Sequence, residues 1–114
     1  MKTKMDYTDI DDIVIVRYHG EMTFFFLSEL ENFLRSKIAQ KRHKFIFDLT
    51  DTTWIDSMGL GLMAMIVKVS LLNGKKVGIV NPSDMVKNAL NISSLLDLMI
   101  IYKTVDDAIR SFNN

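Results

Sequence analysis

Residues 54–61 read Trp54-Ile55-Asp56-Ser57-Met58-Gly59-Leu60-Gly61, and they join two segments with different hydrophobic patterns. Before them, residues 45–49 form a short apolar run typical of a buried strand, and residues 50–53 form a polar loop. After them, apolar residues recur at helical spacing as far as Leu72, where Asn73-Gly74 is a typical helix end. The sequence therefore predicts a strand, a loop and a helix over 57–72, with the quoted stretch at the helix N-terminus.

A helix N-terminus at this position favours negative charge, because its first backbone N–H groups lack partners and the macrodipole is positive there. Asp56 or Ser57 can cap the helix. Gly59 and Gly61 have no Cβ, so another backbone or the surface of a partner can approach closely. An exposed Ser57 could carry a phosphate that the helix terminus stabilises. The spacing alone also fits a plain capping pair, which is the commoner reason for such residues.

Outward from this stretch, the sequence predicts alternating strands and helices on both sides. Upstream, we expect strands over 4–8 and 13–18, a turn marked by Asp9, Asp11 and Asp12, a helix from Phe26 to Ile38 and a charged break over 40–44. Downstream, we expect strands over 76–80 and 99–102, a helix capped by Ser83 and a last helix opened by Thr104. This order predicts one α/β domain over residues 1–114, with a mixed sheet of about five strands.

The composition is that of a small globular protein. The chain has 114 residues, of which 48% are hydrophobic and 25% charged, so one core is expected. Fourteen basic residues balance fourteen acidic ones, which argues against nucleic-acid or membrane binding. The absence of cysteine excludes disulfides and thiolate metal sites. The sequence shows neither a signal peptide nor an apolar stretch long enough to span a bilayer, and we expect a cytoplasmic protein.

The segment Asp56-Ser57-Met58-Gly59-Leu60-Gly61 resembles the Asp-Ser-x-Gly-Leu-Gly signature of the STAS family. More narrowly, it is similar to bacterial anti-sigma factor antagonists of the sporulation and general-stress type. The resemblance extends over nearly the whole chain, with further matches at residues 20–23, 47–49, 81–83 and 90–93. Two positions differ from the family pattern. Thr23 stands where the family has an aspartate, and Met58 stands where it usually has a small residue.

The resemblance implies a STAS fold, in which about four helices pack mainly on one face of the mixed sheet. It also implies a non-enzymatic switch without a cofactor. In this family, the unmodified antagonist binds an anti-sigma factor, which is an ATP-dependent serine kinase, and a sigma factor is released. The kinase phosphorylates the serine at the position of Ser57 and thereby switches the antagonist off, and a PP2C-type phosphatase reverses the modification. Asp56, Gly59 and Gly61 complete the motif around this serine.

Apolar residues near Ser57 predict a contact surface for a partner. The helix over 57–72 carries two apolar stripes, and only one of them needs to face the sheet. The sheet-facing stripe is predicted to be Leu60, Met63, Ala64, Val67 and Leu71, and the second stripe is Met58, Leu62, Met65, Val69 and Leu72. The second stripe fits either a neighbouring helix or a partner. Three consecutive phenylalanines, 24–26, cannot easily all point inward. The predicted partner-binding residues are Met22, Thr23, Phe25, Met58 and Leu62.

Two alternatives remain open at this stage. A STAS scaffold or transport-associated module would bind partners without being phosphorylated. A small nucleotide-binding or phosphotransfer enzyme would use Asp48, Asp51 and Asp56, which cluster near the end of one predicted strand. Loop solvation and capping also explain these aspartates, and His19 and His43 lack the companions of a metal site.

Overall fold

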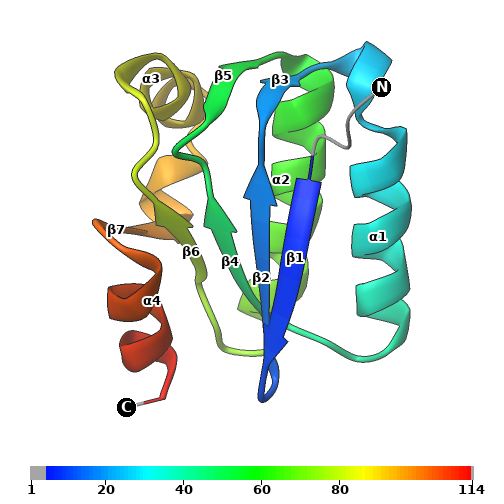
Figure 1. Ribbon diagram of the computed structural model, residues 1–114, viewed down its shortest axis with the longest axis vertical. Coiled ribbons are helices and arrows are strands. Elements are labelled where there is room, and N and C mark those ends of the chain that lie inside the picture. The colour runs from blue at the N-terminus through cyan, green and yellow to red at the C-terminus, as the bar shows by residue number, and fades with distance from the viewer. Residues whose placement is uncertain (1–4, 114) are drawn as a thin grey trace.

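A computed structural model describes residues 5–113, which form a five-stranded mixed sheet with a small two-stranded sheet above it (Figure 1). The main sheet has the order β1-β2-β4-β6-β7; β1 is antiparallel to β2, and the other neighbours are parallel. In the small sheet, β3 pairs in parallel with β5. The strands are β1 (Met5–Ile10), β2 (Ile13–Tyr18), β3 (Gly20–Met22), β4 (Lys44–Asp48), β5 (Thr52–Ile55), β6 (Val77–Val80) and β7 (Met99–Tyr102).

The helices cover the two faces of the main sheet unequally. Three of them contribute to the larger core cluster on one face, and the fourth packs against a smaller cluster on the other face. In Figure 1, α2 lies behind the sheet. This arrangement confirms the predicted α/β fold with helices mainly on one face. The helices are α1 (Ser28–Ala39), α2 (Ser57–Leu72), α3 (Asp84–Ile92) and α4 (Val105–Phe112), with 3-10 turns η1 (Phe24–Phe26) and η2 (Leu96–Leu98).

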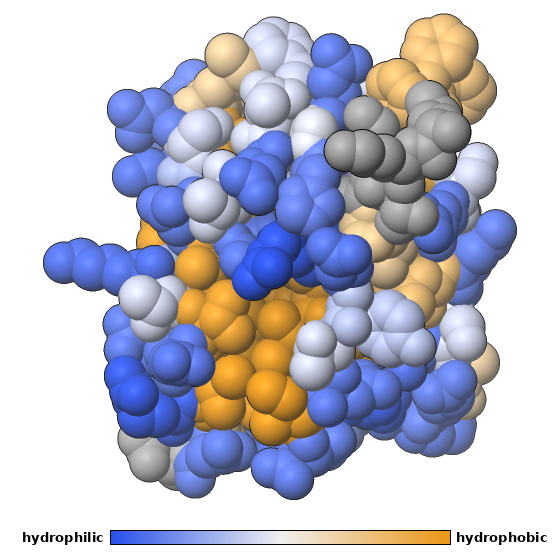
Figure 2. All heavy atoms as spheres, viewed as in Figure 1, coloured by the Kyte–Doolittle hydropathy of each residue, from blue (hydrophilic) through white to orange (hydrophobic). Residues whose placement is uncertain are grey.

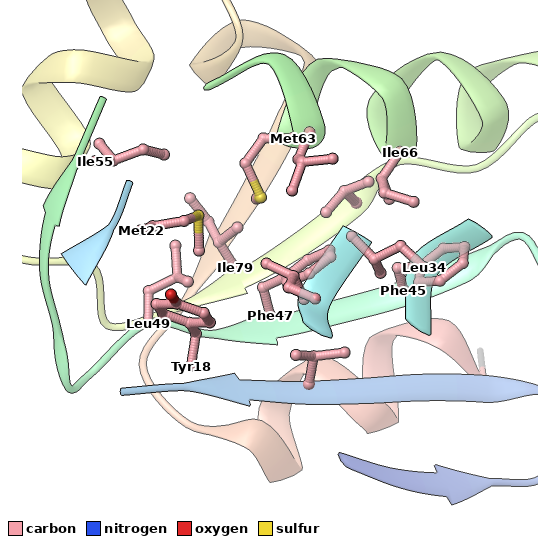
Figure 3. Packing of buried hydrophobic residues seen from close by; sticks show 14 of the residues in the cluster. Tyr18, Met22, Leu34, Phe45, Phe47, Leu49, Ile55, Met63, Ile66 and Ile79 are labelled. Atoms are coloured by element: carbon pink, nitrogen blue, oxygen red, sulfur yellow. The ribbon is translucent and has the colours of Figure 1, made fainter. Parts of the chain in front are cut away.

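The central strands are apolar on both faces because both faces are covered. Alternate residues of β4 point to opposite sides, so that Phe45 and Phe47 enter the larger cluster and Ile46 enters the smaller one. Figure 3 shows the two phenylalanines on the side of the sheet where Met63 and Ile66 of α2 lie. This packing holds α2 against the sheet and so positions residues 54–61, which lead into this helix.

The helix α4 has only eight residues and leaves part of its face of the sheet open. Figure 2 shows an apolar area there, between α4 and β1. A shallow groove of about 190 Å³ lies in this region, with Ile10, Ile15, Val105 and Ile109 among its lining residues. No helix within residues 5–113 has the length and hydrophobicity needed to cross a membrane.

Most predicted elements are confirmed, and the errors lie mainly at the boundaries of elements. The bounds of α2 and β7 are as expected, and the Ser83 and Thr104 side chains cap α3 and α4. The loop predicted over 50–53 is confirmed for residues 50 and 51 only, because Thr52 already belongs to β5. Phe26 lies in η1, before α1 begins, and Asp9 lies within β1 and not in the turn. Residue 4, where a strand was predicted to begin, lies outside the described residues.

Candidate functional site

The Asp56 carboxylate fastens the start of α2 to the segment that follows β3. Its Oδ1 accepts hydrogen bonds from the backbone N–H groups of Met58 and Gly59, each at 3.0 Å. Its Oδ2 accepts a hydrogen bond from the backbone N–H of Phe24 at 3.1 Å. Asp56 is therefore the N-cap of α2, and Ser57 is the first residue of the helix. The predicted capping is confirmed for Asp56.

These hydrogen bonds favour the charged form of Asp56. Partial desolvation raises its pKa, but the backbone N–H groups of Gly59, Phe24 and Met58 together lower it by more. The pKa of the folded state is therefore below the ordinary value for aspartate. A carboxylate of this kind stabilises the fold above its unfolded-state pKa, and the contribution is lost as the pH falls through the folded-state pKa.

We expect Asp56→Ala to lower the free energy of unfolding by about 1 to 2 kcal/mol near neutral pH, because three backbone N–H groups lose their acceptor. The difference from the wild type should shrink below about pH 4, where protonation weakens the native carboxylate as an acceptor. Urea denaturation of both proteins at neutral and acidic pH measures this. A difference that stays the same at both pH values would contradict the assignment of charge to Asp56.

The two glycines of the motif have different structural roles. A Cβ at Gly59 would overlap the carbonyl oxygen of Met22 and would lie 2.8 Å from Cγ1 of Ile55. Gly59 therefore allows α2 to pack directly onto the backbone of β3. A Cβ at Gly61 would meet no atom within 4 Å. The fold itself does not need a glycine at position 61, which lies on the exposed side of the helix.

We expect Gly59→Ala to destabilise the fold by about 1 to 3 kcal/mol, since the β3 backbone must move to make room. Gly61→Ala should instead stabilise it by roughly 0.5 to 1 kcal/mol, because alanine is the better residue within a helix. Thermal or denaturant unfolding of the two variants provides the comparison. Equal effects of the two substitutions would show that Gly59 is not under the steric constraint described.

Ser57 lies beside a groove between the first turns of α1 and α2. Its side chain is exposed, and no described residue forms a hydrogen bond with its hydroxyl group. The groove has a volume of about 320 Å³. On the α1 side, Glu31 and Arg35 form an ion pair with a distance of 3.0 Å between Arg35 Nε and Glu31 Oε2. The lining residues are Phe24, Leu27, Ser28, Glu31, Arg35, Ser57, Met58, Gly61, Leu62 and Met65.

The STAS domain model matches residues 4–108, which is most of the chain. The chain belongs to the STAS domain family. An anti-sigma-B factor antagonist of Staphylococcus epidermidis is 30% identical over 89 residues, which are 78% of this chain and 82% of the relative. The curated relatives are named as antagonists of anti-sigma factors, which are regulatory proteins.

Solved structures share the fold of this STAS domain. The crystal structure of Thermotoga maritima TM1081 matches it with a TM-score of 0.87 at 23% identity, over 96% of this chain and 95% of the other. The anti-sigma factor antagonist SpoIIAA in its unphosphorylated form matches with a TM-score of 0.83 at 20% identity, over 96% of each chain. Bacillus SpoIIAA in the phosphorylated form matches with a TM-score of 0.77 at 19% identity, over 95% and 98% of the two chains.

The five predicted partner-binding residues of this STAS domain differ in how much of their surface is exposed. Phe25 is 84% exposed and Met58 is 50% exposed, whereas Thr23 is half-buried. Met22 has no exposed surface, so the structure places it in the core and not on the free surface where a partner contact was predicted. Figure 3 shows Met22 and Ile55 on the two strands of the small sheet, among the core side chains. Leu62 is only 8% exposed and forms part of the groove floor without being a free contact residue.

The two predicted stripes of α2 also need correction. Leu71 was expected to face the sheet but is exposed, and Ile66, which belongs to neither stripe, is completely buried. The reason is that α2 packs on the sheet and also on α1, so its buried surface is wider than one stripe and centred differently. Glu31 and Arg35 line the groove, although no sequence pattern indicates this. Their spacing places them on one side of α1 but does not say which neighbour that side faces.

The three aspartates that suggested an enzyme do not converge on one site in this STAS domain. Asp48 accepts hydrogen bonds from Thr50 and, at 3.0 Å, from Arg17 Nε, while Asp56 turns toward α2. Asp51 lies beside His19, with 3.2 Å between Oδ2 and Nδ1. Partial burial raises the pKa of Asp48, and its bonds to Thr50 and Arg17 lower it by more. Among residues 5–113, no three His, Cys, Asp or Glu side chains are grouped to hold a metal ion.

Proposed function

We propose that this STAS domain is an anti-sigma factor antagonist that is switched off by phosphorylation of Ser57. In its unmodified form it binds an anti-sigma factor serine kinase in the cytoplasm, and a sigma factor is released. The Ser57 hydroxyl then attacks the γ-phosphorus of ATP held by the kinase, ADP leaves, and a base of the kinase takes the proton. A PP2C-type phosphatase hydrolyses the phosphoserine and restores binding. The STAS domain supplies only the hydroxyl group.

One observation carries this proposal: Ser57 is an exposed, unbonded hydroxyl at the first residue of α2 and at the edge of the α1–α2 groove. A partner seated in this groove would cover Ser57. Phe24, Phe25 and Met58 are exposed close to the start of α2. Large aromatic side chains and flexible methionines are effective anchors in protein interfaces. The names of the relatives, and the two solved forms of SpoIIAA, support the same function.

The charge distribution explains how a phosphate at Ser57 would act on binding. A phosphoserine carries about −1.5 to −2 charges at neutral pH. Among the residues that the structure describes, the charged side chains lining the groove that it borders are Glu31 and Arg35, and Arg35 is already paired with Glu31. A partner that covers the phosphate would have to desolvate it close to another carboxylate, which is costly. The modification therefore opposes binding without disturbing the core.

The experiment that tests this function is incubation with labelled ATP, with and without a candidate anti-sigma kinase. Labelling that requires the kinase is the expected result. Labelling of the chain alone would indicate an enzyme. Binding to the kinase without labelling would favour the alternative of a STAS scaffold that is not phosphorylated.

We expect Ser57→Ala to abolish phosphate incorporation and to leave kinase affinity within about threefold of the wild type, since only one exposed oxygen is removed. Mass spectrometry after the kinase reaction locates the phosphate. Thr52 is a poor acceptor because it is buried and its hydroxyl donates to the Tyr18 carbonyl at 3.0 Å. Thr53 is exposed, so it is the alternative phosphate acceptor with which Ser57 is compared. Phosphate on Thr53, retained in Ser57→Ala, would contradict the assignment.

A further inference from the structure

A second groove lies between the C-terminal half of α2 and the turn η2, and its volume is about 310 Å³. Its lining residues are Ala64, Val67, Lys68, Leu71, Leu72, Leu95 and Leu98. Three of these leucines are exposed, Leu71 and Leu98 at 39% each and Leu72 at 76%. Among the described residues, this α2–η2 groove shares no lining residue with the groove between α1 and α2.

The shape of the α2–η2 groove fits another helix. Its α2 wall is a stripe at positions i, i+3, i+4 and i+7, which lie on one face of a helix over two turns. These positions are Ala64, Val67, Lys68 and Leu71. Ala64 is small, so a second helix can approach α2 closely there. Leu95 and Leu98 form the facing wall, and a ridge of apolar side chains on a partner helix can enter between the two walls.

Unpaired lysines make the rim of the α2–η2 groove positive. Lys68 lines the groove, and Lys75 and Lys76 follow the end of α2. Lys76 and Leu98 directly precede the first residue pair between β6 and β7, so they lie close together. None of the three lysines forms an ion pair with another described residue. Asp97 is the acidic residue nearest to the lining residues in sequence, and it does not line the groove. These charges favour a negatively charged partner.

We propose that the α2–η2 groove binds an acidic amphipathic helix of a partner protein. Apolar side chains of that helix would cover the exposed leucines, and carboxylates on its flanks would pair with the unpaired lysines. A contact of this size is a small interface and therefore a weak one, with a dissociation constant on the order of 10 μM.

This site is independent of the proposed switch. Ser57 and Leu72 are the first and last residues of α2, and the rise of a helix places them about 22 Å apart along its axis. In Figure 1, α2 runs along the sheet behind it. Ser57 borders the groove between α1 and α2, whereas the second site opens between α2 and η2. A helix bound at the second site therefore leaves Ser57 uncovered.

Fluorescence anisotropy with the full chain and a designed peptide tests the proposal, and no kinase is required. The probe is a fluorescein-labelled peptide of about 20 residues, with leucines at i, i+3, i+4 and i+7 and glutamates on both flanks. The control peptide has lysines in place of the glutamates. We expect the acidic peptide to bind, and the basic peptide to bind about tenfold more weakly or less. Equal affinities, or no binding of the acidic peptide at about 1 mM, would overturn the proposal.

Variants of the chain locate the site. We expect Lys68→Glu to weaken binding of the acidic peptide by about tenfold and Leu72→Ser by about fivefold. Lys103→Glu is the matched control and should stay within about twofold of the wild type. Lys103 is also exposed and forms no ion pair with another described residue, but it lies beyond β7, about 16 Å along the strand from Leu98. Equal losses in Lys68→Glu and Lys103→Glu, or no loss in either, would place the peptide elsewhere.

Thermal unfolding checks that these variants remain folded, which is expected because Lys68, Leu72 and Lys103 are exposed. Vesicles of phosphatidylglycerol are a second probe, since lysines beside leucines also suit an anionic membrane. We expect no co-sedimentation with them, because a concave groove receives a protruding ridge and not a flat surface. Co-sedimentation that Lys68→Glu abolishes, with no binding of the acidic peptide, would assign this surface to a membrane and overturn the proposal.

Discussion

Ser57→Asp is expected to weaken binding of the anti-sigma kinase by about a hundredfold and to leave the unfolding transition cooperative and close to that of the wild type. The fold tolerates the charge because position 57 is exposed at a helix N-terminus, where a negative charge is worth about 0.3 to 1 kcal/mol. Asp56 already occupies the N–H groups of Met58 and Gly59, so the gain should lie at the lower end. In the proposed interface, the same charge would be desolvated beside Glu31.

Thermal unfolding and titration calorimetry on one preparation separate these two effects. A Ser57→Asp protein that binds with wild-type affinity would place this edge of the groove outside the interface. A protein that loses binding because it has unfolded would mean that the switch works through stability, which would contradict the mechanism proposed here. Ser57→Asn is the matched control, since it has nearly the same shape as aspartate without the charge.

Met58→Asp is expected to weaken kinase binding by roughly tenfold to a hundredfold, because it replaces an exposed apolar side chain beside Ser57, in the proposed interface, with a charge. Met85→Asp is a closely matched control. Both methionines are 50% exposed, and each is the second residue of its helix, α2 or α3. Effects of a new N-terminal charge on the helix are therefore alike in the two variants.

The two variants should have similar unfolding midpoints and different affinities for the kinase. Equal loss of affinity in both, or a loss confined to Met85→Asp, would mean that the contact surface is wrongly placed. Leu62 was also a predicted partner-binding residue, but Leu62→Asp is not a useful probe of binding. Leu62 is almost fully buried, and a charge there would be expected to destabilise the fold itself.

The elements that could be predicted from sequence are those with local signals. The helix α2 begins at a capping aspartate and ends at Asn73-Gly74, and both signals lie within a few residues of the helix. The pairing of β3 with β5 joins segments about thirty residues apart, and its register is irregular between Gly20 and Glu21. No local pattern encodes such a pairing, so the sequence predicts no strand at β3 and a loop where β5 begins.

In the candidate site, too, features with a local signal could be predicted, and features that depend on tertiary packing could not. A cap at Asp56 or Ser57 could be predicted from the motif, since the chemistry of a helix N-terminus depends on neighbouring residues only. The two glycines could not be told apart, because only the position of β3 shows that Gly59 is constrained and Gly61 is not. The burial of Met22 and the lining of the groove by Glu31 and Arg35 depend in the same way on tertiary packing.

The most direct test of the central claim is calorimetric titration of the anti-sigma kinase with one preparation of this chain in two states. The chain is first phosphorylated to completion on Ser57, titrated, treated with a PP2C-type phosphatase, and titrated again. The account predicts no measurable binding in the first titration and full binding in the second, with the same unfolding midpoint in both states. Equal affinity before and after removal of the phosphate would contradict it.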